Sequence, residues 1–174
     1  MKPINTLLTI LFISLLSSPS WSKSYDELVK REGLYYQRFT DVPYTGKVFG
    51  KNQGSFKNGE YDGAWVSYYK DGQLDYKGNY KNGEKDGAWV SYHNNGSLNY
   101  KGDYKNGEKD GAWVSYYDYE SYGSLDSYGS NDQLESKGNY KNGKREGTWV
   151  SYDEDGTVYT PWTGTFKDGV KISD

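Results

Sequence analysis

The chain repeats itself every 24 residues, and this period constrains its fold more than any other feature. Trp65, Trp89 and Trp113 are 24 residues apart, and Trp149 follows 36 residues after Trp113. One unit reads WVSYYKDGQLDYKGNYKNGEKDGA and the next reads WVSYHNNGSLNYKGDYKNGEKDGA. A fixed period of this length is typical of a repeat protein, in which each unit packs on its neighbours in sequence.

The repeat array occupies residues 46–174. The half-units GSFKNG and GTFKDG flank the full units on either side. The third unit is longer than the others by 12 residues, which form an insert at 119–130. The insert is rich in Tyr, Ser and Gly, so it fits either a recognition loop or a duplicated surface loop without a role of its own.

Each unit predicts β-hairpins. Asn-Gly and Asp-Gly pairs, such as Asn82-Gly83 and Asp71-Gly72, supply the positive φ angles of tight hairpin turns. The segments between the turns, WVSYY and QLDYKGNY, are rich in aromatic and β-branched residues and alternate with a period of two. We therefore predict an all-β fold: tandem antiparallel β-hairpin repeats forming an elongated, twisted, mostly single-layer sheet of about nine strands, roughly 40 Å across.

Two strand registers fit the first hairpin. A two-residue turn at Asp71-Gly72 places Trp65 opposite Gly78, so that the indole covers the bare glycine backbone and one face of the sheet is aromatic. A three-residue turn with a bulge at Gly72 instead leaves Trp65 on the polar face. The first register gives cleaner separation of the two faces, and we take it as the prediction.

The N-terminus predicts export. Residues 1–22 combine one basic residue, Lys2, with 13 largely apolar residues from Ile4 to Leu16 and a run of small residues. This stretch is shorter than the roughly 20 residues that a spanning helix needs. We predict a signal peptide cleaved after Ser22 or Ser20, an uncleaved tether being the alternative. The mature protein is then bacterial periplasmic or extracellular, with no stable membrane span.

Residues 23–45 form a cap segment ahead of the array. Ser24 and Glu27 fit a helical capping box, and Gly33 fits a helix stop. The pattern predicts a short N-terminal helix of two turns that covers the end of the sheet.

Composition excludes several classes of site. The 174 residues include no Cys and one His, which excludes thiolate chemistry and metal sites that need two such ligands. The formal net charge of -3 disfavours nucleic acid as a partner. His93 occupies a position held by Tyr in neighbouring units, so a structural role explains it. We predict no catalytic residues, no metal and no cofactor.

Two aromatic rows carry the binding potential of the sequence. These rows are Trp65, Trp89, Trp113 and Trp149, and Tyr68, Tyr92, Tyr116 and Tyr152. The rows are three positions apart on a strand, so alternation places them on opposite faces of the sheet. The rings either replace a core in a thin sheet or form an exposed row that stacks on a partner protein or on sugar rings.

The landmarks of the unit, G-x-W-V-S-Y-Y, L-x-x-x-G-x-Y and K-N-G-x-x-D-G, resemble the variant form of the MORN repeat from about Val48 to Gly169. Tandem copies of this kind resemble the bacterial YwqK-type antitoxins. The resemblance implies a β-hairpin array that binds rather than catalyses, and the antitoxin likeness implies a partner protein that is neutralised.

Together these features predict an exported, non-enzymatic protein-interaction scaffold, with an antitoxin-like or immunity-like role as its sharper form. The alternative is an envelope carbohydrate-binding or cell-wall-binding module that uses the aromatic face. Aromatic-Gly repeats of the glucan-binding type share the GxW landmark, although at a shorter period.

Overall fold

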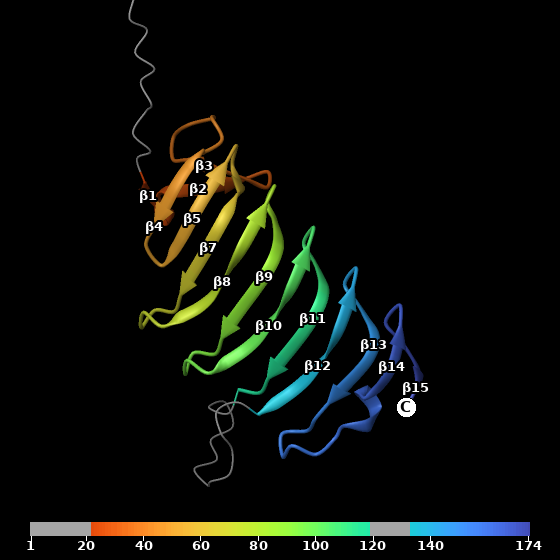
Figure 1. The fold of residues 1–174 in the computed structure, drawn as a ribbon. Helices are drawn as coiled ribbons and strands as arrows, with labels where there is room; N and C mark the ends of the chain where they lie inside the picture. Colours follow the sequence, from red (N-terminus) through yellow and green to blue (C-terminus); the bar gives the residue numbers. More distant parts are fainter. Residues whose placement is uncertain (1–21, 119–132) are drawn as a thin grey trace, which may run out of the picture.

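The computed structural model describes residues 22–118 and 133–174, and most of them form one long sheet of consecutive hairpins (Figure 1). The strip runs from the N-terminal strands at one end to the C-terminal strands at the other. Residues 1–21 of the predicted signal peptide and the predicted insert at 119–130 lie outside the described residues. The all-β class and the hairpin array are confirmed.

The sheet has 13 strands among the described residues. They are β1 (Lys23–Ser24), β4 (Gly46–Phe49), β5 (Asn52–Lys57), β6 (Glu60–Tyr61), β7 (Gly63–Tyr68), β8 (Leu74–Lys81), β9 (Glu84–Tyr92), β10 (Leu98–Lys105), β11 (Glu108–Tyr116), β12 (Leu134–Lys141), β13 (Lys144–Ser151), β14 (Gly164–Lys167) and β15 (Val170–Ser173). From β4 onward, neighbouring strands pair antiparallel, whereas β1 pairs parallel with β4. A short 3₁₀ turn, η3 (Thr160–Trp162), lies between β13 and β14.

The predicted N-terminal helix is wrong. Only a 3₁₀ turn, η1 (Tyr25–Glu27), forms, and the chain then makes a separate hairpin of β2 (Leu28–Arg31) and β3 (Leu34–Gln37). Glu32 and Gly33 have φ angles of 49° and 86°, so Gly33 completes a two-residue turn instead of ending a helix. The hairpin is favoured because it places apolar side chains over the first strands of the sheet.

This hairpin packs on the first strands of the sheet and adds a local second layer there. Leu28 is buried with Phe56 and Trp65. The Tyr35 ring lies 4.8 Å from the Phe56 ring, and the Tyr25 ring lies 6.0 Å from the Trp65 ring. The mostly single layer therefore thickens at its N-terminal end.

The Lys-Asn-Gly turns form as the sequence predicts. Asn82 and Gly83 have φ angles of 50° and 79°, both in the left-handed region, and join Lys81 to Glu84 across a two-residue loop. Asn58, Asn106, Asn142 and Asp168 have the same geometry. The turn glycines also link successive units, since Gly107 N donates to Lys85 O at 3.0 Å.

The opposite hairpin tips follow the second of the two registers. Tyr69 N donates to Gln73 O at 2.8 Å, which leaves a three-residue loop instead of the two-residue turn. Gly72 has a φ of 91°, and the Asp71 carboxylate accepts a hydrogen bond from Gln73 N at 3.0 Å. A three-residue loop ending in a left-handed glycine is a common hairpin connection.

Deeper in the hairpin the first register holds. A bulge between Ser67 and Tyr68 compensates for the longer loop, so Trp65 pairs with Gly78 as predicted. Nearer the tip, a two-residue turn would place Tyr69 opposite Leu74, but Tyr68 pairs with Leu74 instead. The extra residue of the bulge is Asp75 on β8, so the alternation along β7, on which the prediction of two aromatic rows on opposite faces rests, is not interrupted.

The Asp-Gly pairs that follow the Lys-Asn-Gly turns form bulges within strands and not turns. Gly87 has a φ of 73° inside β9, where the register shifts between Lys77 and Asn79 of β8. The neighbouring carboxylates reach the next turn: Asp110 Oδ2 accepts a hydrogen bond from Asn142 N at 3.1 Å, and Glu146 Oε2 accepts one from Asp168 N at 3.0 Å. These acidic residues therefore connect units.

Each Trp covers a glycine, although not the one predicted. Trp65 pairs with Gly78, but its ring lies over Gly54 of the preceding strand, and Gly78 is covered by Trp89. The same relation joins Trp113 to Gly102 and Trp149 to Gly138. A Cβ built at any of these four glycines would lie 2.0 to 2.3 Å from an indole carbon. None of the four has a left-handed φ, so glycine is required here for space.

Candidate functional site

The Trp row forms the core of the array. Trp65, Trp89, Trp113 and Trp149 are 2%, 1%, 5% and 0% exposed. Tyr rings from neighbouring strands meet them edge-on: Tyr80 lies 5.0 Å from Trp89 at 84°, and Tyr140 lies 4.8 Å from Trp149 at 73°. Edge-to-face contacts of this kind stabilise aromatic clusters beyond the area they bury. The indoles therefore hold the strands together from inside the packed face.

A cation covers the ring of each of the last three members of the Trp row. Lys85 Nζ lies 4.2 Å from the ring centre of Trp89, and Lys109 Nζ lies 3.8 Å from that of Trp113. The Arg145 guanidinium lies 4.4 Å from the ring centre of Trp149. Burial lowers the pKa of both lysines below its ordinary value, because the charged form loses water. These cations seal the Trp row against solvent.

The Tyr row lies near the hairpin tips and is partly exposed. Its members are Tyr68, Tyr92, Tyr116 and Tyr152. Their carbonyl groups connect the units: Tyr69 Oη donates to Tyr92 O at 2.7 Å, and Tyr117 Oη donates to Tyr152 O at 2.7 Å. His93 makes the corresponding contact, with Nε2 3.1 Å from Tyr116 O, and a carbonyl can only accept. His93 thus replaces Tyr in this hydrogen bond between neighbouring units.

The face opposite the Trp row carries Ala and Val side chains on alternate strands, and we call it the Ala/Val face. It consists of Ala64, Val66, Ala88, Val90, Ala112 and Val114. Two adjoining hollows of about 410 and 280 Å³ lie on it and share Ala88 and Lys101 in their linings. This face spans β7 to β11.

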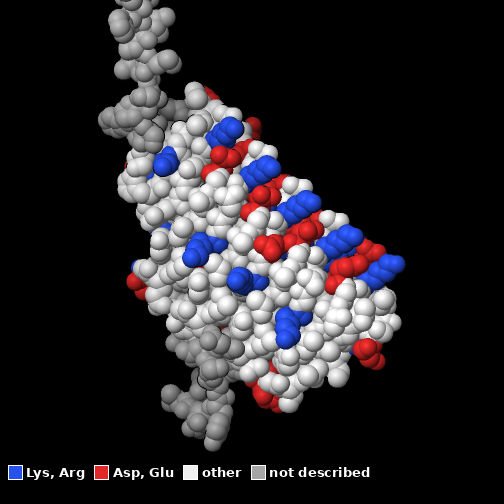
Figure 2. Space-filling view, in the orientation of Figure 1, with Lys and Arg blue, Asp and Glu red and all other residues white. Residues whose placement is uncertain are grey.

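Basic side chains cross the Ala/Val face at regular intervals. Lys77 pairs with Val66 and Val90, and Lys101 pairs with Val90 and Val114. Lys137 continues the line on β12, and all three lysines are exposed. Figure 2 shows separate basic side chains over β8, β10 and β12, apart from the mixed row of basic and acidic side chains along the Lys-Asn-Gly edge. The edge row is dense in carboxylates, whereas the lysines of the Ala/Val face stand apart from one another, with Asp103 beside Lys101.

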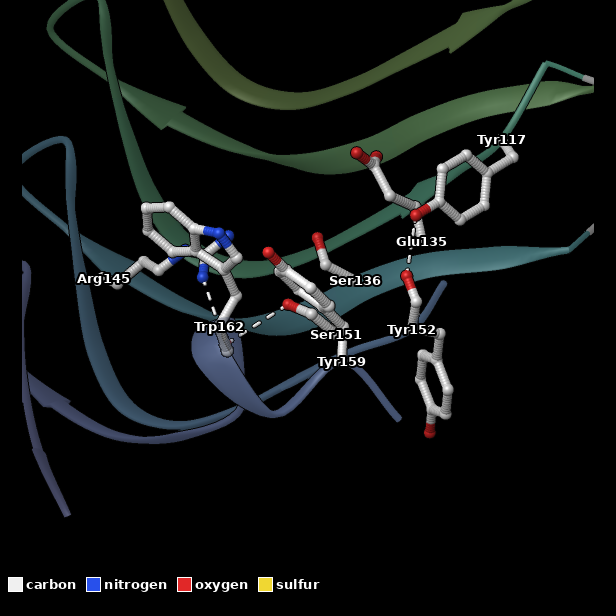
Figure 3. Close-up of a pocket in the computed structure, with 8 residues that line it drawn as sticks. All are labelled: Tyr117, Glu135, Ser136, Arg145, Ser151, Tyr152, Tyr159 and Trp162. Atoms are coloured by element: carbon white, nitrogen blue, oxygen red, sulfur yellow. Dashed lines mark hydrogen bonds between the residues drawn. The ribbon is translucent and has the colours of Figure 1, made fainter. Parts of the chain in front are cut away.

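A mixed polar and aromatic pocket of about 290 Å³ lies near the C-terminal end (Figure 3). Its lining residues are Tyr117, Glu135, Ser136, Arg145, Ser151, Tyr152, Tyr159 and Trp162. Trp162 and Tyr159 are 52% and 37% exposed. Trp162 O accepts hydrogen bonds from Arg145 Nη1 and Ser151 Oγ, both at 3.3 Å. These bonds fix η3 against β13.

Of the predicted site residues, only Tyr152 lines this pocket, and the described ring contacts do not join the Tyr row to the Trp row. Sequence reasoning missed Ser136, Arg145, Tyr159 and Trp162. A usable signal was present, because the chain departs from the repeat at two of these places: Ser136 of the third unit replaces a Tyr, and the segment 157–163 beyond that unit does not fit the pattern.

No group of three or more His, Asp or Glu residues suited to a metal ion occurs in residues 22–118 and 133–174. Within those same ranges, no helix is both long and apolar enough to cross a bilayer.

This geometry defines a β-hairpin repeat protein. Three segments, residues 61–82, 85–106 and 145–160, match the family model described as MORN repeat variant. The stretch between the second and third matches contains the insert. MORN repeats are generally protein-interaction or membrane-interaction repeats. No curated protein matches the chain, so the resemblance to YwqK-type antitoxins stays a prediction.

Proposed function

We propose that this protein is an exported, non-enzymatic interaction protein that binds an acidic partner protein on its Ala/Val face. The observation that supports this most directly is the line of exposed lysines, Lys77, Lys101 and Lys137, beside the Ala and Val side chains of this face, which Asn79 and Asp103 also line. The lysines lie two strands apart, which is roughly 10 Å.

Charge complementarity argues for the partner's chemistry. An apolar surface crossed by basic groups suits a partner that presents carboxylates around an apolar patch, since opposite charges steer association and fix its register. The aliphatic stems of the lysines add to the apolar area. The Trp row contributes to partner binding only indirectly, because its packing keeps the opposite face of the sheet rigid.

The antitoxin resemblance and the predicted signal peptide together give the proposal its sharper form. The partner is then a toxin met in the bacterial periplasm or outside the cell, and binding neutralises it. A gene for a secreted toxin beside this one would support the immunity role.

The test is capture from envelope extracts with immobilised mature protein, residues 23–174, compared among three proteins. We expect the unchanged protein to retain one acidic protein in a one-to-one ratio. Lys101→Glu should lose at least 90% of it, because a carboxylate then faces the partner's own carboxylates. Lys105→Glu makes the same charge change on the same strand, at the exposed Lys-Asn-Gly edge, and should retain it.

Two outcomes would contradict the proposal. If the unchanged protein retains no partner, the proposed binding function is wrong. Equal loss in Lys101→Glu and Lys105→Glu would place the contact away from the Ala/Val face.

A further inference from the structure

The third unit lacks an aromatic ring that the first two units share. Tyr76 and Tyr100 occupy equivalent positions on β8 and β10, and Ser136 stands there on β12. The Tyr100 ring stacks on Trp113, with ring centres 4.9 Å apart and planes at 17°, and the Tyr76 ring lies 5.8 Å from Trp89. The third unit therefore lacks a Tyr ring at this place, and the ring beside its cation is Trp162, whose centre lies 5.0 Å from the Arg145 guanidinium.

The pocket of Figure 3 has the surroundings of that missing ring. Tyr76 pairs with Ser91, and its ring lies 6.0 Å from Lys85 Nζ. The equivalent residues of the third unit, Ser151 and Arg145, both line the pocket, and Ser136 pairs with Ser151. The pocket volume of about 290 Å³ is large enough for a six-membered ring.

A second departure from the repeat supplies the pocket with aromatic walls. The segment 157–163 replaces a regular strand and contains the 3₁₀ turn η3, in which Pro161 precedes Trp162. Tyr159 and Trp162 border the pocket but remain 37% and 52% exposed. Core packing does not require rings that remain this exposed, whereas a ligand would bury them.

The polar groups of the pocket include both donors and acceptors. Arg145 supplies a guanidinium, Glu135 supplies a carboxylate, and Ser136 and Ser151 supply hydroxyls. Arg145 has no carboxylate within salt-bridge distance among the described residues. A pyranose ring needs this combination, since it presents apolar C–H faces to aromatic rings and hydroxyls that both donate and accept.

We propose that this pocket binds a single pyranose unit of a glycan, with Trp162 and Tyr159 as stacking platforms. An aromatic side chain of a partner protein would fit the volume but could not hydrogen-bond the Glu135 carboxylate as sugar hydroxyls can. The two serine hydroxyls already bond within the protein, Ser136 Oγ to Ser115 Oγ and Ser151 Oγ to Trp162 O. The site is separate from the Ala/Val face, so it stands or falls independently of the protein-binding function proposed above.

The test titrates the mature protein with methyl glycosides of glucose, N-acetylglucosamine and glucuronic acid, followed by saturation-transfer NMR. A single exposed sugar subsite gives a dissociation constant of about 1 mM. We expect at least one of the three sugars to bind in this range. Ser136→Tyr restores the residue of the other units and should weaken binding at least tenfold while the protein stays folded.

Two further variants complete the design. Trp162→Ala should also weaken binding at least tenfold, because it removes the larger platform. Lys141→Gln on the same strand, at the exposed Lys-Asn-Gly edge, is the matched control and should bind as the unchanged protein does. Denaturant midpoints measured alongside report whether each variant is folded.

Three results would overturn the proposal. The first is no binding of any of the three sugars up to about 50 mM, well above the expected constant. The second is sugar binding that Ser136→Tyr and Trp162→Ala leave unchanged. The third is binding of N-acetyl-tyrosinamide in preference to the sugars, which would make the pocket a receptor for an aromatic side chain.

Discussion

Gly78→Ala should destabilise the array by about 3 kcal/mol, through a clash and not through backbone strain. The new Cβ would lie 2.2 Å from Cδ2 of Trp89, whereas carbon atoms in contact stay about 3.5 Å apart, so the ring must retreat by about 1.3 Å. The ring cannot retreat freely, because Nε1 donates to Asn79 O at 3.1 Å and Lys85 lies on its face. Overpacking of this kind costs about 1–3 kcal/mol, and losing the hydrogen bond adds about 1 kcal/mol.

The assay is urea unfolding of the mature protein, followed by Trp fluorescence and by far-ultraviolet circular dichroism. Gly87→Ala is the matched control in the same unit: no atom lies within 4 Å of its Cβ, but its φ of 73° is strained for Ala. That strain costs about 1 kcal/mol. Equal losses of unfolding free energy in Gly78→Ala and Gly87→Ala would refute the claim that Gly78 is required because the Trp89 ring leaves no room for a Cβ.

A double-mutant cycle sharpens the same test. Trp89→Leu alone should cost about 3 kcal/mol, because it removes a buried ring. Combined with Gly78→Ala, it should cost at least 1 kcal/mol less than the sum of the two single changes, since the smaller side chain leaves room for the new methyl group. Strict additivity would mean that Trp89 and Gly78 do not interact.

Three further predictions concern the turns, the pH response and export. Asn106→Ala should lower the free energy of unfolding by about 1 kcal/mol, because Asn106 has a φ of 49°, and an unchanged urea midpoint would contradict this. Burial raises the pKa of Tyr25 from 10.0 to about 12 and raises those of Tyr80 and Tyr100, so stability should be complete below pH 10 and fall from pH 10 toward 12. A urea midpoint that stays constant to pH 12 would be inconsistent with that burial. Mass spectrometry of the envelope fraction should find a chain beginning at Lys23, or at Trp21 for the earlier cleavage site, and an unprocessed cytosolic chain would contradict export.

The sequence predicts the array well, because the signals that set it are local and repeated. Asn82-Gly83 specifies its turn through two backbone angles, and the same pair recurs in the other units. The pairing of Trp65 with Gly78 is also predictable, since only one register separates an aromatic from a polar face.

Other features depend on tertiary contacts. Ser24 to Gly33 has the capping signals of a helix, but packing of Leu28 and Tyr35 on the first strands favours a hairpin. The direction in which each indole leans is a choice between two neighbouring glycines that no strand pattern decides.

The candidate sites were predictable only in part. The aromatic rows are visible in the sequence, but cations also cover the rings of the Trp row. The position of Lys85 in the sequence does not predict that it lies on Trp89. The pocket was not predicted, because the prediction rests on residues that recur in every unit, whereas Ser136 differs from the Tyr of the other units.

The most direct test of the central claim, that the Ala/Val face binds a partner, is lysine labelling in intact envelopes. Lys77, Lys101 and Lys137 are exposed in the isolated chain, as are Lys81, Lys105 and Lys141 at the Lys-Asn-Gly edge. Acetylation of the protein in envelopes should modify the first three at least five times more slowly than in the purified protein, with the edge lysines unchanged. Equal reactivity of all six lysines in both settings would contradict the claim.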